Sequence, residues 1–307
     1  MANMNVLILG VTASGKGGLG LGLAKKLGGE VVSVDSMKVY RRMDIGTAKP
    51  SGQSQSAVKH HLIDVVEPSE SFSVAEFLEL ADAAIADING RGKPVIAVGG
   101  TALYIKAMLY GLFEGPGTDE AIRKNLKEKI TRFGLADLHA ELARIDSEAA
   151  ERIHPNDEKR IVRAMEVFEL TGRPISSFQR QFDQPRPVRD FKVIGLRREK
   201  EDASGRINRR VKKMVEAGLV EEVRGLLAEK DPLSKQAACA IGYAEVINHL
   251  RGEIGLDETV ELIKKNTRKL AKGQRTWFKT FRDVAWLDLE RDETVENLLG
   301  HVMDVLE

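Results

Sequence analysis

A short apolar run that leads directly into a glycine-rich loop is the feature that most constrains this chain. Residues 6–9 read Val-Leu-Ile-Leu, and residues 10–17 read Gly-Val-Thr-Ala-Ser-Gly-Lys-Gly. The glycines and the lysine have the spacing of a phosphate-binding loop, in which backbone N–H groups and one lysine surround a di- or triphosphate. Taken alone, the loop could also be a strand-to-helix turn without a ligand. The loop spacing therefore predicts a phosphate site at the carboxyl end of the first strand.

Short β-branched runs alternate with helical patterns along much of the remaining chain. Besides residues 6–9, they are Val31–Val34, Val95–Val98 and Lys192–Leu196. This alternation predicts an α/β fold, a P-loop NTPase-like parallel sheet covered by helices. Ligands of such sheets lie beyond the carboxyl ends of the strands, where this sequence places residues 10–17, Asp35-Ser36 and Gly99-Gly100-Thr101. We expect these segments to meet in one site.

Two stretches rich in glycine, proline and aspartate, Gly111–Asp119 and Asp183–Pro187, enclose a segment with almost continuous helical periodicity. We therefore predict a helical insertion at residues 114–186 within a P-loop core formed by residues 1–113 and 187–307. The last third of the chain is mainly helical in pattern, with a long helix at about Leu256–Phe281.

Charge is balanced over the whole chain but clustered near its end. The 47 Lys and Arg against 46 Asp and Glu exclude a strongly basic nucleic-acid binder. Residues 264–282, however, hold eight basic residues and no acidic one. On a helix, six of them fall within an arc of roughly 100°, and we call these six the cationic ridge: Lys265, Arg268, Lys272, Arg275, Lys279 and Arg282. With the acid-free run at residues 206–213, the ridge predicts polyanion binding. We expect the neighbouring Trp277, Phe278 and Phe281 to be core residues.

The sequence also indicates a compartment. Its one cysteine, Cys239, excludes an intramolecular disulfide framework and fits a reducing environment. The first residues lack the features of a signal peptide, and no apolar stretch is long enough to span a membrane. We expect a cytoplasmic monomer.

Candidate reactive groups follow the second and third strands. Asp35 could act as a general base or hold a metal, although a lone aspartate is more often a helix cap. Thr101 is by default also a cap. A phosphate-loop kinase would have a strand ending in an aspartate for Mg²⁺, and Asp64 is the nearest substitute. His60 and His61 are adjacent and cannot share one face, which disfavours a metal site there.

Taken in order, these segments resemble the tRNA dimethylallyltransferase (isopentenyltransferase) family. The similarity spans nearly the whole chain and consists of GVTASGK at 10–16, VSVDS at 32–36, VYRRMDIGTAKP at 39–50, HHLID at 60–64, GGTALYI at 99–105, HPNDEKRIVRAMEVFELTG at 154–172, RINRRVKKMVEAGLVEEV at 206–223, AIGYAE at 240–245 and a TRxxAKxQxTWF-like tail at 267–278.

The resemblance implies transfer of a dimethylallyl group from dimethylallyl diphosphate to N6 of the adenosine at position 37 of a tRNA, with Mg²⁺ as cofactor. It assigns catalysis to Asp35, Thr101 and Lys16, with Asp35 as the base and Lys16 stabilising the leaving diphosphate. The diphosphate would contact Gly10, Val11, Thr12, Ala13, Ser14, Gly15, Lys16, Gly17 and Arg206. The tRNA anticodon stem-loop would contact Asp35, Ser36, Met37, Lys38, Thr101, Arg123, Lys159, Arg160, Ile161, Val162 and Arg163.

The chain departs from the family pattern at four positions. They are Gly17 in place of Thr or Ser, Lys38 in place of Gln, Ala244 in place of Lys and Gly273 in place of Arg. Only the first removes a group expected to touch the diphosphate and its Mg²⁺, so we expect slower or weaker diphosphate use and a higher kcat/KM for Gly17→Thr. A small-molecule ATP-dependent kinase and a catalytically weakened tRNA-binding paralogue remain alternatives.

The helix after the loop carries three further glycines, Gly18, Gly20 and Gly22. Each costs about 1 kcal/mol relative to alanine in a helix interior. Either this helix packs unusually closely on the sheet, or the sequence has drifted.

Overall fold

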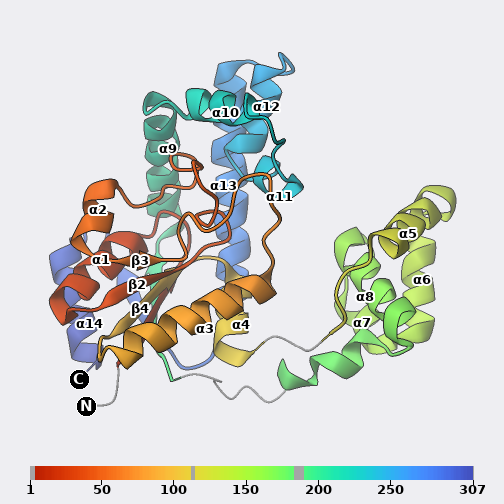
Figure 1. The fold of residues 1–307 in the computed structure, drawn as a ribbon, viewed down its shortest axis with the longest axis horizontal. Helices are drawn as coiled ribbons and strands as arrows, with labels where there is room; N and C mark the ends of the chain where they lie inside the picture. The colour runs from red at the N-terminus through yellow and green to blue at the C-terminus, as the bar shows by residue number, and fades with distance from the viewer. Residues whose placement is uncertain (1–3, 112–114, 183–189, 307) are drawn as a thin grey trace. The chain divides into compact units, whose positions relative to one another are not determined.

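The computed structural model describes residues 4–111, 115–182 and 190–306 (Figure 1). The chain divides into two compact units, which are described separately below. Residues 1–109 and 189–307 form the sheet unit, and residues 110–188 form the helical unit. The boundaries expected from the sequence, at 113/114 and 186/187, and the Asp183–Pro187 stretch lie outside the described residues.

A parallel six-stranded sheet forms the centre of the sheet unit. Its strands are β1 (Asn5–Gly10), β2 (Glu30–Val34), β3 (His60–His61), β4 (Val95–Gly99), β5 (Lys192–Arg198) and β6 (Val284–Leu289), in the order β3-β2-β4-β1-β5-β6. The four predicted strands and the α/β fold are confirmed. The sequence analysis missed β3 and β6: β3 has two residues, and β6 is an edge strand whose first four residues are only partly buried.

Helices cover this sheet and continue beyond it. They are α1 (Lys16–Leu27), α2 (Gly52–Ala57), α3 (Val74–Gly90), α4 (Ala102–Tyr110), α9 (Lys200–Glu216), α10 (Leu219–Leu227), α11 (Lys235–Ala238), α12 (Tyr243–Leu250), α13 (Leu256–Phe278) and α14 (Val295–Leu306). The predicted long helix ends at Phe278 and not at Phe281, because the backbone N–H and hydroxyl of Thr280 both bind the Trp277 carbonyl in a tight turn. None of the described helices is long and apolar enough to cross a membrane.

Close packing explains two glycines of α1, Gly20 and Gly22. A Cβ atom on Gly20 would lie 2.4 Å from Cγ2 of Val98 in β4, and one on Gly22 would lie 3.0 Å from Leu299 in α14. Because valine is stiff at χ1, only glycine lets α1 approach β4 this closely. The structure therefore favours close packing over drift. The core between α1, α14 and the sheet includes Val6, Ile8, Leu19, Leu23, Ile194, Leu298 and Val302.

The helical unit has its own core. Its elements are α5 (Glu120–Phe133), α6 (Leu135–Ile145), α7 (Ser147–Arg152), α8 (Glu158–Thr171) and the 3₁₀ helix η1 (Ile175–Phe182). Leu126, Leu138, Leu142, Ile161 and Met165 are almost fully buried in it. Buried Asp146 connects two elements, because its carboxylate accepts hydrogen bonds from the N–H groups of Ala149 and Ser176.

Candidate active site

The three strand-end segments meet at one edge of the sheet. Gly99 lets β4 lie against the end of β2, since a Cβ atom there would be 2.1 Å from the Val34 carbonyl oxygen. A Cβ atom on Gly100 would lie 3.4 Å from both the Gly10 carbonyl oxygen and Lys16 Nζ. Across the same edge, the Ser36 N–H donates to Thr101 Oγ1 over 3.1 Å. The structure thus brings the phosphate loop beside the segments after β2 and β4.

The phosphate loop connects β1 to α1 by a turn that requires glycine. Gly15 has φ +101°, a left-handed conformation that glycine adopts without strain. Lys16 is the first residue of α1, and its Nζ donates to the Val11 carbonyl over 3.1 Å. Ser14 is buried, and its hydroxyl has no hydrogen-bond partner among the described residues.

A glutamine from the other end of the chain completes the loop. Gln274 of α13 accepts a hydrogen bond from the Thr12 N–H over 2.8 Å and donates to the Gly100 carbonyl over 2.8 Å. It therefore connects the loop to the segment after β4. The sequence analysis did not single out Gln274, although it lies inside the tail motif at 267–278.

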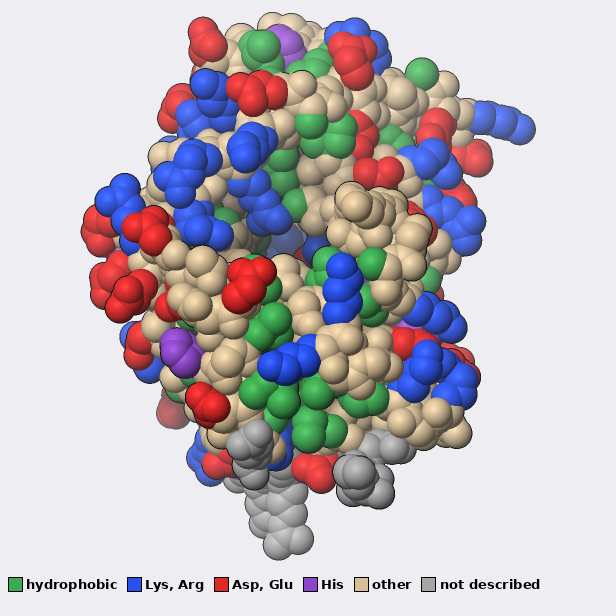
Figure 2. All heavy atoms as spheres, turned by 90° about the vertical axis from the view of Figure 1, so that its left-hand side faces the viewer, with side chains coloured by type: hydrophobic (Ala, Val, Ile, Leu, Met, Phe, Trp, Pro, Cys, Tyr) green, Lys and Arg blue, Asp and Glu red, His purple; other side chains and the backbone are tan. Residues whose placement is uncertain are grey.

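Four cationic side chains surround the loop, and we call them the loop cations: Lys16, Lys38, Arg206 and Arg210. Arg206 Nε donates to the Ala13 carbonyl over 3.0 Å, and Arg210 donates to the Thr12 hydroxyl over 3.2 Å. Within the described part of the chain, none of the four forms an ion pair with a carboxylate. Figure 2 shows Lys and Arg side chains gathered beside a hollow in the surface. Arg210 was not among the predicted diphosphate ligands.

The loop cations are electrostatically destabilised. Burial and the charges of Lys38 and Arg210 lower the pKa of Lys16 to about 7, although Asp35 opposes this shift. Burial is also the largest cause of the lowered pKa values of Lys38, Arg206 and Arg210. Because charged groups removed from water need a counter-charge, this arrangement favours a bound polyanion.

Asp35 lies within this positive region. Its Oδ1 accepts hydrogen bonds from the Met37 N–H (2.9 Å) and the Lys38 N–H (3.3 Å), which fix the carboxylate. Asp35, Lys16 and the other three loop cations all line one cavity of about 980 Å³. A cavity of this size accommodates a small organic diphosphate beside one nucleobase.

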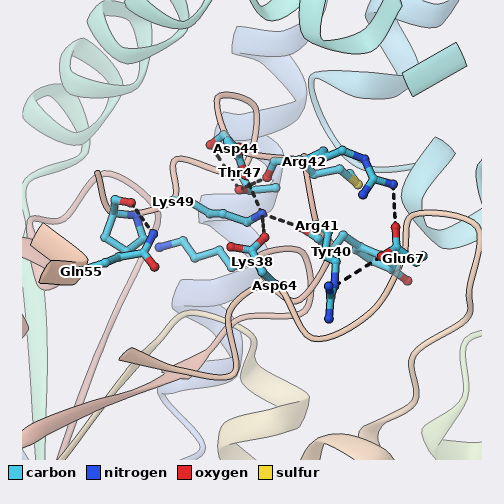
Figure 3. A network of polar contacts seen from close by, with 12 residues as sticks. Lys38, Tyr40, Arg41, Arg42, Asp44, Thr47, Lys49, Gln55, Asp64 and Glu67 are labelled. Atoms are coloured by element: carbon cyan, nitrogen blue, oxygen red, sulfur yellow. Dashed lines mark hydrogen bonds and ion pairs between the residues drawn. The ribbon is translucent and has the colours of Figure 1, made fainter. Parts of the chain in front are cut away.

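The segment between β2 and β3 forms a rigid wall of this cavity (Figure 3). The Lys49 ammonium donates to Asp44, Asp64 and the Tyr40 carbonyl. In addition, the Glu222 carboxylate accepts hydrogen bonds from three consecutive N–H groups at residues 44–46. Asp64 therefore serves as an ion-pair partner in this wall.

The residues near the loop do not fit a protein-held Mg²⁺ ion. Gly17 has no hydroxyl, one oxygen of Asp35 is used by backbone N–H groups, and Asp44 and Asp64 bind Lys49. Across residues 4–111, 115–182 and 190–306, no three His, Cys, Asp or Glu side chains are grouped to hold a metal. His60 and His61 instead bind the Val58 carbonyl and Glu30.

The predicted tRNA residues of the helical unit have different environments. Lys159 and Arg160 are exposed at the start of α8. Ile161 and Val162 are 0% and 6% exposed, so their side chains pack in the core, and the expectation that this stretch contacts tRNA stays a prediction. The helical periodicity of α8 turns both of them inward. Arg123 and Arg163 form ion pairs with buried Glu166.

The cationic ridge is shorter than predicted. Lys279 caps α13, and Arg282 lies beyond its end. Arg268 donates to Asn208 of α9 over 2.7 Å, whereas Lys265 and Lys272 are exposed. The core positions predicted beside the ridge are confirmed for Phe278 and Phe281, which are buried; Trp277 is only partly so.

Comparisons with known proteins agree with this geometry. A family model described as IPP transferase matches residues 38–281. The chain is 51% identical to a tRNA dimethylallyltransferase of Geobacter metallireducens, over 92% of each chain. It is similar to a tRNA isopentenylpyrophosphate transferase structure from Bacillus halodurans (39% identity, TM-score 0.69, covering 99% of this chain and 97% of that one). It is also similar to a eukaryotic dimethylallyltransferase described as acting on tRNA (25% identity, TM-score 0.79, covering 99% and 80%). The chain therefore belongs to the IPP transferase family.

Proposed function

We propose that this chain transfers a dimethylallyl group from dimethylallyl diphosphate to N6 of the adenosine at position 37 of a tRNA and releases diphosphate. The observation that carries the proposal is the group of four loop cations, without carboxylate partners among the described residues, around a glycine-rich loop beside Asp35. The family match favours this reaction over the small-molecule kinase considered above.

The loop cations act on the leaving group. As the bond between the allylic carbon and the diphosphate oxygen breaks, negative charge accumulates on the diphosphate. Lys16, Arg206 and Arg210, together with the loop N–H groups, stabilise that charge without having to reorganise. The electron pair of the broken bond leaves with the diphosphate.

Asp35 acts on the nucleophile. The exocyclic amine of adenosine is weakly nucleophilic, and its nitrogen forms the new bond to the allylic carbon as it loses a proton. Asp35 holds the amine in line and accepts this proton, since only its Oδ1 is fixed by backbone donors. Thr101, which accepts the Ser36 N–H, positions the segment that carries Asp35. The adenosine must leave its stack to reach this cavity.

Recognition of the tRNA uses exposed cations. We assign backbone contacts with the anticodon stem-loop to Lys159 and Arg160 of the helical unit and to Lys265 and Lys272 of the ridge. In this proposal the enzyme is a cytoplasmic monomer.

A single-turnover assay tests the proposal. Purified protein is mixed with an unmodified tRNA transcript, dimethylallyl diphosphate and Mg²⁺, the cofactor that the resemblance implies, and the digested nucleosides are analysed by mass spectrometry. We expect N6-dimethylallyladenosine, a loss of about 10²–10⁴-fold in rate for Asp35→Asn, and an unchanged rate for Asp304→Asn, an exposed aspartate of α14. Retention of tRNA without product would instead identify a binding paralogue.

A further inference from the structure

Two departures from the family pattern lie on the same cavity. Gly17 and Lys38 both line it, one on α1 and the other after β2. The first removes a hydroxyl that would reach a metal ion, and the second adds a positive charge. The two changes are therefore opposite in their effect on a bound diphosphate: one weakens a metal-mediated contact and the other supplies a direct one.

A comparison of Lys38 with Lys49, another lysine on the cavity wall, shows that Lys38 is available for a ligand. Lys49 Nζ is held by Asp44, Asp64 and the Tyr40 carbonyl. Lys38, in contrast, uses only its backbone N–H, on Asp35, and no hydrogen bond or ion pair of its ammonium is found in the described structure. In Figure 3 the Lys38 side chain extends away from the Lys49–Asp64 pair and carries no dashed line.

The ammonium of Lys38 also lies close to the diphosphate site. After burial, its charge is the next cause of the lowered pKa of Lys16. Burial is also the largest cause of the lowered pKa of Lys38; Asp35 opposes this shift, and Arg210 and Lys49 add to it. A partly buried cation beside other cations is unfavourable in the free protein. A bound anion with several negative charges relieves this repulsion.

We propose that Lys38 supplies the charge that a loop-bound metal ion would otherwise provide, so that this chain binds the diphosphate without a divalent cation. The proposal rests on the proposed function, because it takes the loop as a diphosphate site. It explains how position 17 tolerates glycine. Lys38 then contacts the leaving group directly.

The structure offers variants that separate this role from folding. A Cβ atom on Gly17 would have no heavy atom within 4 Å, so threonine fits there without displacing a neighbour. Lys38→Gln restores the common family residue and removes the charge. Lys25→Gln removes the same charge from an exposed residue of α1 that does not line the cavity, and is the matched control.

The test is calorimetric titration with inorganic diphosphate, in EDTA and in Mg²⁺. We expect the wild-type Kd in EDTA to lie within about threefold of that in Mg²⁺, and Lys38→Gln to weaken binding in EDTA by about 10–100-fold. Lys38→Arg should rescue binding in EDTA, and Lys25→Gln should change it by less than about threefold. In the Lys38→Gln background, Gly17→Thr should make Mg²⁺ improve binding by about tenfold.

Two results would overturn the inference. One is a wild-type protein that loses more than about tenfold in affinity when Mg²⁺ is removed. The other is an equal loss for Lys38→Gln and Lys25→Gln, since that would reflect the charge of the whole protein and not the position of Lys38. The proposed function fails separately, if wild-type protein binds no diphosphate in either condition and forms no prenylated nucleoside.

Discussion

Two clusters of basic side chains, one in each unit, have opposite electrostatic environments. In the helical unit, Arg123 and Arg163 both bind the carboxylate of Glu166, which is fully buried and also accepts the Asp119 N–H. In the sheet unit, the loop cations surround a cavity without a carboxylate partner among the described residues. The first cluster has its ion-pair partner in the free protein. In the second, Asp35 opposes the lowered pKa values of three loop cations without forming an ion pair with them, which favours binding of an anion.

This difference distinguishes basic residues that stabilise the fold from basic residues that bind a ligand. Resemblance alone assigns Arg123, Arg163 and Lys38 to the same class of tRNA contacts. The structure divides them. Arg123 of α5 and Arg163 of α8 both bind Glu166 of α8, whereas the Lys38 ammonium forms no ion pair within the described residues. Basic residues with a buried counter-charge stabilise the fold, and those without one are sites for a negatively charged ligand.

The largest expected effect is the loss of catalytic rate when one of the loop cations is removed. Lys16→Ala should lower the single-turnover rate about 10³-fold, because a charge aimed at the leaving diphosphate is removed. The far-ultraviolet circular dichroism spectrum should not change. Lys25→Ala, on the exposed side of the same helix, is the control and should retain its rate. A loss of less than tenfold for Lys16→Ala would show that the cluster does not act in catalysis.

The cluster formed by Arg123, Arg163 and Glu166 should affect the stability of the protein. Glu166→Ala removes the shared counter-charge and should lower the free energy of unfolding of the helical unit by about 3 kcal/mol. Urea unfolding monitored by circular dichroism measures this. Glu169→Ala, an exposed position on the same helix, should change stability by less than about 0.5 kcal/mol. Equal stability of the two variants would contradict a structural role for Glu166.

Removing one of the loop cations should raise the stability of the protein, the opposite of the effect expected for Glu166→Ala. Lys38→Gln removes a positive charge that burial disfavours in the free protein and should raise the free energy of unfolding of the sheet unit by about 1 kcal/mol, at the expense of ligand affinity. The same urea experiment, without diphosphate, measures the change. A destabilised Lys38→Gln protein would mean that Lys38 has a counter-charge in solution.

The smallest expected effect is a change in the number of protons that the protein takes up when it binds diphosphate. The pKa of Lys16 is about 7 in the folded protein and 10.5 in the unfolded chain. Between these pH values Lys16 is protonated only in the unfolded chain, so the free energy of unfolding rises with pH. At pH 8 the free enzyme holds Lys16 mostly neutral, and a bound diphosphate raises its pKa. Binding should therefore take up close to one proton, measured by titration in two buffers of different ionisation enthalpy. Lys16→Ala gives the background, and an equal uptake in that variant would exclude Lys16.

Local patterns in the sequence predicted the sheet and the loop. β1, β2, β4 and β5 are apolar runs bounded by turns, and the Gly-Lys spacing after β1 identifies the loop wherever the rest of the chain lies. What could not be predicted depends on contacts distant in sequence. Nothing local to Arg210 indicates that it reaches the Thr12 hydroxyl, and nothing local to Ile161 distinguishes a helix face that meets RNA from one that meets a core.

The bridge made by Gln274 has a consequence for the order in which the enzyme becomes active. The phosphate loop is translated more than 200 residues before α13, but its Thr12 N–H and the Gly100 carbonyl find their partner only in α13. A nascent chain can therefore carry every residue of the loop and still lack its final conformation. The site is assembled only after α13 has left the ribosome, so a translation product that stops before α13 would contain the motif without the finished loop.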